Sequence, residues 1–158
     1  MNAFLRNWWP ALVWACVIFT LSTDSFSAAH TASFFDPIFK WLMPSLTHHQ
    51  LVQLNHVIRK CAHFTEYFIF YLLLFRGFRR GQRGWRWTWA LAALAVAAVY
   101  ASLDEVHQAF VASRGASPWD SLLDSFGAFI GAAVVWLWFQ FRRRPSSDPG
   151  LAPETARD

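Results

Sequence analysis

Apolar residues occur in four long blocks along the chain, separated by segments rich in polar and charged residues. The blocks cover residues 8–21, 61–75, 85–103 and 122–139. A helix that crosses the hydrocarbon core of a bilayer needs about 20 predominantly apolar residues. The last two blocks come close to that length directly, and the first two reach it with flanking residues, as 3–21 and 57–75. The pattern therefore predicts an all-α protein with four transmembrane helices packed as a bundle.

The segments between the blocks predict further structure. Residues 33–44, in the first outer loop, are rich in aromatic side chains. They indicate either an interfacial segment on the outer headgroups or a loop packed across the helix tops. Thr47 and Gln50 match a capping box, which predicts a helix that starts at His48 and continues unbroken into the second span. Residues 1–144 form one predicted membrane domain, and residues 145–158, rich in Pro, Ser, Ala and charge, form a predicted disordered cytoplasmic tail.

Composition favours a membrane protein over two alternatives. Hydrophobic residues make up 55% of the 158 residues and charged residues 15%, whereas a soluble domain carries about 25% charged residues. A soluble protein with four buried helices would have too little polar surface. A cleaved signal peptide over the first block fits Arg6 but fits Asp24 and Phe26 poorly. Cys16 and Cys61 fall within apolar blocks and are expected to act as small buried apolar residues, without a disulfide.

The distribution of Lys and Arg predicts an orientation. Ten lie at the N-terminus, in the loop between spans two and three, or in the tail, and four lie in the other two loops. Basic residues accumulate on the cytoplasmic side, so both termini and the loop at residues 76–86 are expected to be cytoplasmic. The net charge of +4 then reflects topology and contact with anionic membrane lipids. A nucleic-acid partner is not expected.

Several ionisable residues are predicted to lie at similar depth in the outer half of the bundle. With a rise of about 1.5 Å per residue, Glu66 lies ~15 Å and His63 ~20 Å above Arg76, which marks the inner end of span two. Counted in the same way along their own helices, Asp104 lies ~26 Å and Asp124 ~27 Å from the inner boundary. The sequence therefore predicts that these side chains converge.

Within each predicted helix, the polar residues of the outer half share one face. The three faces comprise Arg59, His63 and Glu66, with Lys60 and Tyr67 at the edge; Tyr100, Asp104 and Gln108; and Asp120, Asp124, Gly127 and Gly131. The two glycines form a GxxxG pattern, which lets a neighbouring helix approach closely. Ionisable side chains inside a bilayer usually face a protein interior or a wet cavity. We therefore expect one polar site inside the bundle, open to the outside.

Most of these polar residues, together with Arg114, divide into two groups by their expected role. Candidate catalytic residues are His63, Glu66, Asp104 and Asp120, and candidate ligand-binding residues are Arg59, Lys60, Tyr67, Gln108, Arg114 and Asp124. The three cations of the second group are suited to holding a phosphate or carboxylate. A buried carboxylate beside His63 is suited to proton transfer.

Other interpretations of the same residues stay open. Glu66 could be a structural, hydrogen-bonded carboxyl, and Arg114 could be an ordinary loop cation. As a variant of the catalytic hypothesis, a divalent cation could be held by Asp104, Asp120 and Asp124, and ligation by carboxylates alone would suit Mg²⁺ or Ca²⁺. The pattern predicts no other cofactor.

Three ordered motifs carry a family resemblance. "RKCAHFTEYFIFYLLL" begins at Arg59 and contains a K-x-x-H-x-x-x-Y pattern, and "DEVHQAFVASR" begins at Asp104 and contains D-E-x-x-Q…R. "DSLLDSFGAFIG" begins at Asp120, and "LSTDSF", with its serines, follows the first block. Through these motifs the chain resembles the VanZ-like family of small integral membrane proteins over roughly residues 10–140.

The resemblance implies a location and a class of partner. The VanZ-like family is linked to resistance against glycopeptide antibiotics, chiefly teicoplanin, which implies a role at the cell envelope, in the bacterial cytoplasmic (inner) membrane, and a lipid-linked envelope precursor as a partner. Two positions depart from the family pattern. Asp124 stands where the pattern has asparagine, which adds a negative charge, and Ser113 replaces the glycine before Arg114.

Three functional hypotheses follow. The first is a membrane enzyme that acts at the outer leaflet on a lipid-linked or amphiphilic envelope molecule. The second is a non-catalytic binder of lipid heads or of a lipophilic antibiotic in the same site. The third is passage of protons or ions through Glu66 and His63, which is weakest because one four-helix chain offers few polar residues to line a pore. The reaction class and the oligomeric state are left open by the sequence.

Overall fold

The chain is all-α in the part that the structure describes. The computed structural model describes residues 2–23, 28–110 and 117–142, and these residues form five helices and no strand. The helices are α1 (Ala3–Leu21), α2 (Ala28–Leu42), α3 (His48–Arg79), α4 (Trp87–Ala109) and α5 (Pro118–Arg142). The all-α prediction is confirmed. The predicted tail at residues 145–158 and Arg114 lie outside the described residues.

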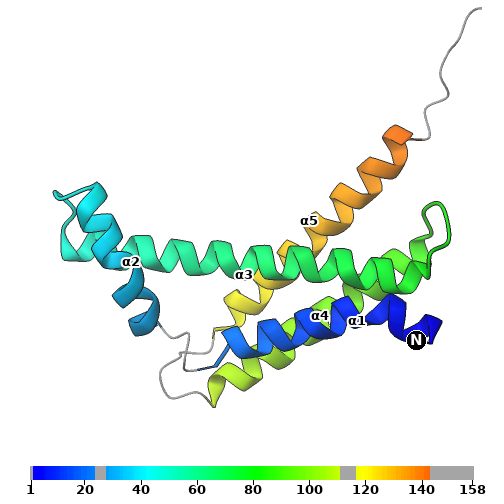
Figure 1. Cartoon of the computed structure of the whole chain (residues 1–158), viewed down its shortest axis with the longest axis horizontal. Helices are drawn as coiled ribbons and strands as arrows, with labels where there is room; N and C mark the ends of the chain where they lie inside the picture. The colour runs from blue at the N-terminus through cyan, green and yellow to red at the C-terminus, as the bar shows by residue number, and fades with distance from the viewer. Residues whose placement is uncertain (1, 24–27, 111–116, 143–158) are drawn as a thin grey trace, which may run out of the picture.

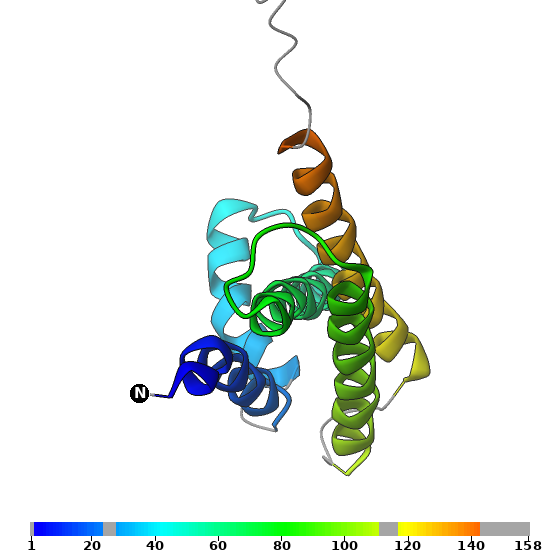
Figure 2. The same cartoon turned by 90° about the vertical axis from the view of Figure 1, so that its right-hand side faces the viewer.

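The long helix α3 is the centre of the arrangement. It packs against α1, α2, α4 and α5, and α4 also packs against α5. Viewed from one end, α3 is surrounded by α1 on one side and by α4 and α5 on the other (Figure 2). The chain reverses direction between α1 and α3, between α3 and α4, and between α4 and α5 (Figure 1). The N-terminus, the α3–α4 turn and the last turn of α5 therefore lie at the same end of the molecule.

The predicted start of α3 is confirmed. Thr47 is the N-cap residue, its side-chain oxygen accepts a hydrogen bond from the Gln50 backbone N–H, and the Gln50 side chain accepts one from the Thr47 N–H. The helix then continues for 32 residues without a break, a length of about 48 Å. It stops where Arg80 and Gly81 adopt left-handed backbone angles, with φ of 48° and 77°.

The core lies between α3 and its neighbours. From α3 it takes large aromatic side chains, among them Tyr67, Phe70 and Tyr71, and from α4 it takes a stripe of buried alanines: Ala90, Ala93, Ala97 and Ala101. The stripe brings the backbone of α4 close to the aromatic rings. On α5, a Cβ atom added at Gly127 would lie 2.4 Å from the Phe64 carbonyl oxygen of α3. The predicted close approach at the GxxxG pattern is therefore confirmed.

Three of the described helices are long and apolar enough to cross a membrane. They are Phe4–Leu21, Trp87–Ala109 and Pro118–Arg142. The predicted second span, in α3, does not meet the same measure of length and composition, so a bundle of four spans is not confirmed by it. Large apolar side chains such as Leu12, Val99 and Phe129 are exposed on the outer surface of α1, α4 and α5. Such a surface is suited to contact with lipid.

Two expectations about surface and core need correction or refinement. Cys16 and Cys61 are free but exposed, so the expectation that they are buried is wrong: both lie on helix faces turned away from the core. Most of the aromatic segment at residues 33–44 belongs to the helix α2, which packs against α3 and exposes Phe34 and Trp41. A hydrogen bond of 2.7 Å from Asn55 Nδ2 to Asp36 Oδ1 fixes α2 to α3.

Candidate functional site

A cluster of polar side chains lies at the helix ends opposite the first turn of α1 and the last turn of α5. It draws on the C-terminal ends of α1 and α4, the N-terminal half of α5 and the middle of α3. The reason is the alternating direction of the helices, which brings the last turns of two of them beside the first turns of a third (Figure 1). Residues predicted from helical rise to lie at one depth therefore do meet in space.

The first part of the cluster joins α1 to α4. The carboxylate of Asp104 accepts hydrogen bonds at Oδ2 from Ser22 Oγ at 2.8 Å and from Gln108 Nε2 at 2.9 Å. All three side chains are buried. Because α4 continues to Ala109, Gln108 lies one helical turn beyond Asp104, on the same face. The two donors hold the Asp104 carboxylate in a fixed orientation.

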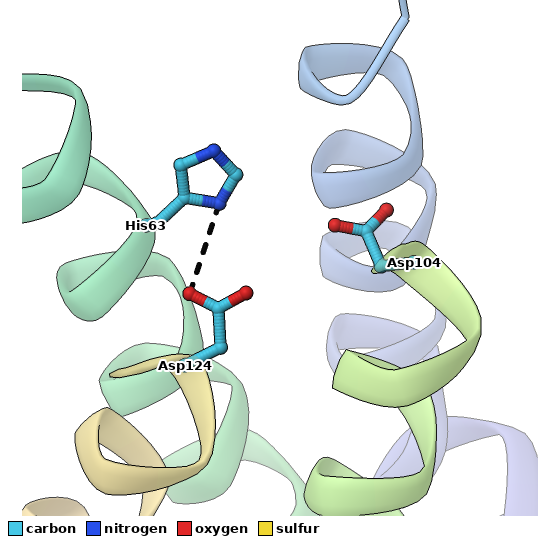
Figure 3. Close-up of side chains that lie close together, drawn as sticks. All are labelled: His63, Asp104 and Asp124. Carbon is cyan, nitrogen blue, oxygen red and sulfur yellow. Dashed lines mark ion pairs between the residues drawn. The ribbon is translucent and has the colours of Figure 1, made fainter. Parts of the chain in front are cut away.

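The second part joins α3 to α5. His63 Nδ1 lies 3.8 Å from Asp124 Oδ1 and 3.9 Å from Glu66 Oε2. The side chains of His63, Glu66 and Asp124 are 18%, 13% and 3% exposed, respectively. His63 and Asp124 point toward one another, and the Asp104 carboxylate points toward the same space from α4 (Figure 3). One imidazole and three carboxyl groups are therefore gathered within the bundle.

The third part lies nearer the surface. Lys60 Nζ forms an ion pair with Asp120 Oδ1 at 2.8 Å, and these side chains are 39% and 37% exposed. Beside the pair, between α3 and α5, is an open groove of about 440 Å³ whose lining includes Val57, Phe64 and Leu123, with Lys60 at one side. The site thus combines a buried polar cluster, a half-exposed ion pair and an adjacent apolar groove.

Aromatic residues support the cluster on its inner side. Tyr67 is fully buried, and its hydroxyl has no hydrogen-bond partner within the described part of the chain. Tyr100, on the predicted polar face of α4, donates a hydrogen bond of 2.7 Å to the Ala15 carbonyl of α1. Trp14 Nε1 donates to the backbone carbonyl of Glu66 at 2.9 Å. These bonds fix α1 to both α3 and α4 directly below the site.

The structure brings most of the predicted site residues together, in a pairing that differs from the predicted metal set. His63, Asp104 and Asp124 each offer one ligand atom within 4.8 Å of the others, and they form the one such group among the described residues. Asp120 is not in this group because Lys60 binds it. Arg59, partly buried, forms no ion pair with another described residue. Arg114 lies outside the described residues.

Sequence reasoning missed one site residue, Ser22. It was visible only as a serine of the "LSTDSF" segment after the first apolar block. Its role depends on a contact with Asp104, 82 residues further along the chain. Periodicity within a helix carries no information about such a partner.

A protein-family model described as VanZ/LLP1 matches residues 7–139 of this chain. The chain belongs to the VanZ/LLP1 family. The match runs from the first turn of α1 almost to the end of α5, so it includes every site residue that the structure describes. The resemblance inferred from the three motifs is thereby confirmed.

Neither the curated proteins nor the solved structures contain a match to this VanZ/LLP1 chain. The chemistry of the VanZ/LLP1 site follows from its own geometry. That geometry offers a base and acid in His63 and the carboxylates, a cation in Lys60, and an apolar surface beside them.

Proposed function

We propose that this VanZ/LLP1 protein is a multi-pass protein of the bacterial cytoplasmic membrane whose outward-facing polar site binds, and acts on, a lipid-linked or amphiphilic molecule of the cell envelope. The observation that carries the proposal is the buried cluster of His63, Asp104 and Asp124 inside a bundle whose outer surface is apolar. Ionisable groups at membrane depth are costly, and they usually mark a functional site.

The distribution of charge supports the outward orientation of the site. Arg76, Arg79, Arg80, Arg83 and Arg86 belong to the α3–α4 turn and its flanks. That turn precedes the first turn of α4, whereas Asp104 and Gln108 of the polar cluster lie in its last turns, at the opposite end of the helix. Basic residues favour the cytoplasmic side, so the cluster belongs to the outer leaflet.

We infer that α3 is the fourth spanning helix. It packs against all three candidate spans. Its ionisable residues, which lower the mean hydropathy, include His63 and Glu66, and these side chains are mostly buried against other helices. A helix that turns its polar residues inward does not expose them to lipid. At about 48 Å it exceeds a hydrocarbon core of about 30 Å, so its first turns, with α2, project from the membrane.

The groove beside Lys60 supports an amphiphile as the ligand. Its lining is mostly apolar, as an acyl or prenyl chain requires, whereas Lys60 supplies a cation for a phosphate or carboxylate head. Both side chains of the Lys60–Asp120 ion pair are more than one third exposed. Water therefore screens the pair, and its net contribution to stability is small. An anionic head group can therefore displace Asp120 from Lys60 at little cost and lie above the buried cluster.

The experiment is the recovery of the protein with its native lipids in polymer nanodiscs, followed by mass spectrometry. We expect one anionic envelope lipid to be more abundant in the wild-type nanodiscs than in the bulk membrane. In Lys60→Met, this enrichment should fall by about tenfold. Lys40→Met, which removes the other lysine of the chain from the exposed face of α2, is the matched control and should keep the enrichment.

Equal lipid profiles for the wild-type protein and Lys60→Met would contradict the proposal. Incubation of the enriched lipid with purified protein then separates an enzyme from a binder, because only an enzyme changes the mass of the lipid. Family membership adds a cellular readout: expression is expected to alter susceptibility to teicoplanin-type glycopeptides, and Lys60→Met is expected to abolish the change.

A further inference from the structure

Three helices each contribute one potential metal ligand to the same point in the bundle. His63 comes from α3, Asp104 from α4 and Asp124 from α5, and their ligand atoms all lie within 4.8 Å of one another. In Figure 3 the three side chains surround a common space. Zn²⁺ binds nitrogen and oxygen ligands at about 2.0–2.2 Å, so two ligand atoms on the same ion are at most about 4.4 Å apart. Small side-chain rotations therefore suffice to bring all three atoms onto a single ion.

A separate observation indicates that a ligand belongs there. Asp124 is 2% exposed, and its Oδ1 atom has no hydrogen-bond partner among the described residues. That oxygen points at His63 Nδ1 from 3.8 Å, too far for a hydrogen bond. A buried carboxylate oxygen without a partner is strongly disfavoured. The separation matches the span of two metal–ligand bonds that meet at a wide angle.

The surroundings of Asp104 are those of an oriented ligand. Ser22 and Gln108 both donate to its Oδ2 atom, and an ionised carboxylate has about four acceptor positions. The Asp104 carboxylate therefore still has acceptor positions that can bind a metal ion. Outer hydrogen bonds of this kind commonly fix ligating carboxylates. Asp120, which the sequence had placed in the metal set, is instead engaged by Lys60.

We propose that His63, Asp104 and Asp124 bind one divalent transition-metal ion, with Zn²⁺ as the best fit. An imidazole nitrogen in the ligand set favours Zn²⁺ over Mg²⁺ or Ca²⁺, which take oxygen ligands. Three protein ligands leave a coordination position for water or for an oxygen of the bound head group, as in catalytic zinc sites. The inference rests on the proposed function for what the metal acts on, but metal binding itself is tested on the protein alone.

The test measures zinc binding by the full chain, purified without a polyhistidine tag and stripped of metal with a chelator. The background carries His48→Ala and His49→Ala, because these exposed neighbours at the start of α3 could bind zinc at the surface. Titration with ZnCl₂ alone is followed by calorimetry and by elemental analysis. We expect one zinc per chain, and a loss of affinity of more than about 100-fold in His63→Ala and in Asp124→Asn, since outer-shell partners alone are worth about 10- to 100-fold.

Asp120→Asn is the matched control. It makes the same change one helical turn from Asp124 and should leave zinc affinity within about threefold of the parent. Cobalt absorption gives a readout that does not depend on stability: Co²⁺ in the parent should show visible bands that Asp124→Asn shifts or abolishes. Melting curves without metal identify any variant that fails to fold, and for such a variant Asp104→Asn is substituted.

Three results would overturn the metal site: no stoichiometric zinc in the parent, parental affinity in both His63→Ala and Asp124→Asn, or an equal loss in Asp120→Asn. The outcome is separable from that of the proposed function. Lipid enrichment without zinc binding refutes the metal site alone, whereas zinc binding without lipid enrichment refutes the amphiphile as ligand.

Discussion

At the scale of single residues, two carboxylates one helical turn apart on α5 have different surroundings. Asp120 is more than one third exposed and bound by Lys60, whereas the Asp124 side chain is 3% exposed and faces His63. The first suits exchange with a ligand from outside, because solvent screens its ion pair. The second is held where desolvation makes every interaction stronger. The site therefore has an exchangeable outer part and a fixed inner part.

Ser22 belongs to the fixed part, and its removal should weaken the protein. In Ser22→Ala, Asp104 Oδ2 loses one of its two donors, and a hydrogen bond to a charged group contributes about 1.5–3 kcal/mol. We expect a free energy of unfolding lower by about that amount, measured by denaturation with SDS in mixed micelles. Thr23→Ala is the control, because the partner of the Thr23 hydroxyl among the described residues is the Thr20 carbonyl of its own helix end. An equal loss in both variants would contradict a specific role for Ser22.

The site was predictable from sequence up to the point at which partners had to be chosen. Helical rise and angle placed His63, Asp104 and Asp124 at one depth on inward faces, and these residues do meet. The same argument could not separate Asp120 from Asp124, because their contacts depend on how α5 crosses α3. Nor could it find Ser22, whose partner lies 82 residues away.

At the scale of helices, local signals predicted more than composition did. The capping box at Thr47 fixed the start of α3, since both of its hydrogen bonds lie within one turn. The helical form of residues 28–42 was not predicted, because the aromatic residues of 33–44 indicated only an interfacial segment or a packed loop, and Pro37 is unfavourable inside a helix. The exposure of Cys16 and Cys61 was also missed. An apolar block in a membrane helix has a lipid-facing side as well as a buried one, and composition cannot distinguish them.

The GxxxG pattern of α5 yields a graded prediction. A Cβ atom at Gly127 would lie 2.4 Å from the Phe64 carbonyl oxygen, which belongs to the backbone and cannot rotate away. At Gly131 the nearest atoms are a ring carbon of Tyr71 at 3.0 Å and the Phe68 carbonyl oxygen at 3.1 Å, so a much smaller shift makes room for the methyl group. Overpacking costs about 1–3 kcal/mol, occasionally more, so we expect Gly127→Ala to lower the free energy of unfolding by more than Gly131→Ala does.

Unfolding in SDS measures both glycine variants against the wild-type protein. Zinc affinity, where it is measured, should fall in Gly127→Ala as well, because separation of α3 from α5 moves His63 away from Asp124. The reverse order of stability, or wild-type stability in Gly127→Ala, would contradict the close approach of these helices.

At the scale of the whole molecule, one geometric fact organises both topology and function. The arginine-rich α3–α4 turn and both ends of the helical region lie at one end of the molecule, and the last turns of α1 and α4 and the first turns of α5 lie away from it (Figure 1). These last turns and first turns carry Ser22, Asp104 and Asp124 of the polar cluster. Basic residues favour the cytoplasmic side of the membrane. If the arginine-rich turn is cytoplasmic, the cluster lies in the outer leaflet. There it can reach envelope molecules but not cytoplasmic ones, so the proposed function depends on this orientation.

Single cysteines test the orientation in intact cells. In a background with Cys16→Ser and Cys61→Ser, which removes the two exposed thiols, Gly81→Cys is placed in the α3–α4 turn and Ser117→Cys at the start of α5. A reagent that cannot cross the membrane should label Ser117→Cys and should label Gly81→Cys only after the cells are permeabilised. If Gly81→Cys reacts in intact cells and Ser117→Cys does not, the bundle is inverted. If both react, α4 does not span, because it is the helix that separates the two positions along the chain. Inversion would move the buried cluster away from the outer leaflet and would remove the envelope ligand with it, because an amphiphile of that leaflet could no longer reach Lys60 or the groove beside it.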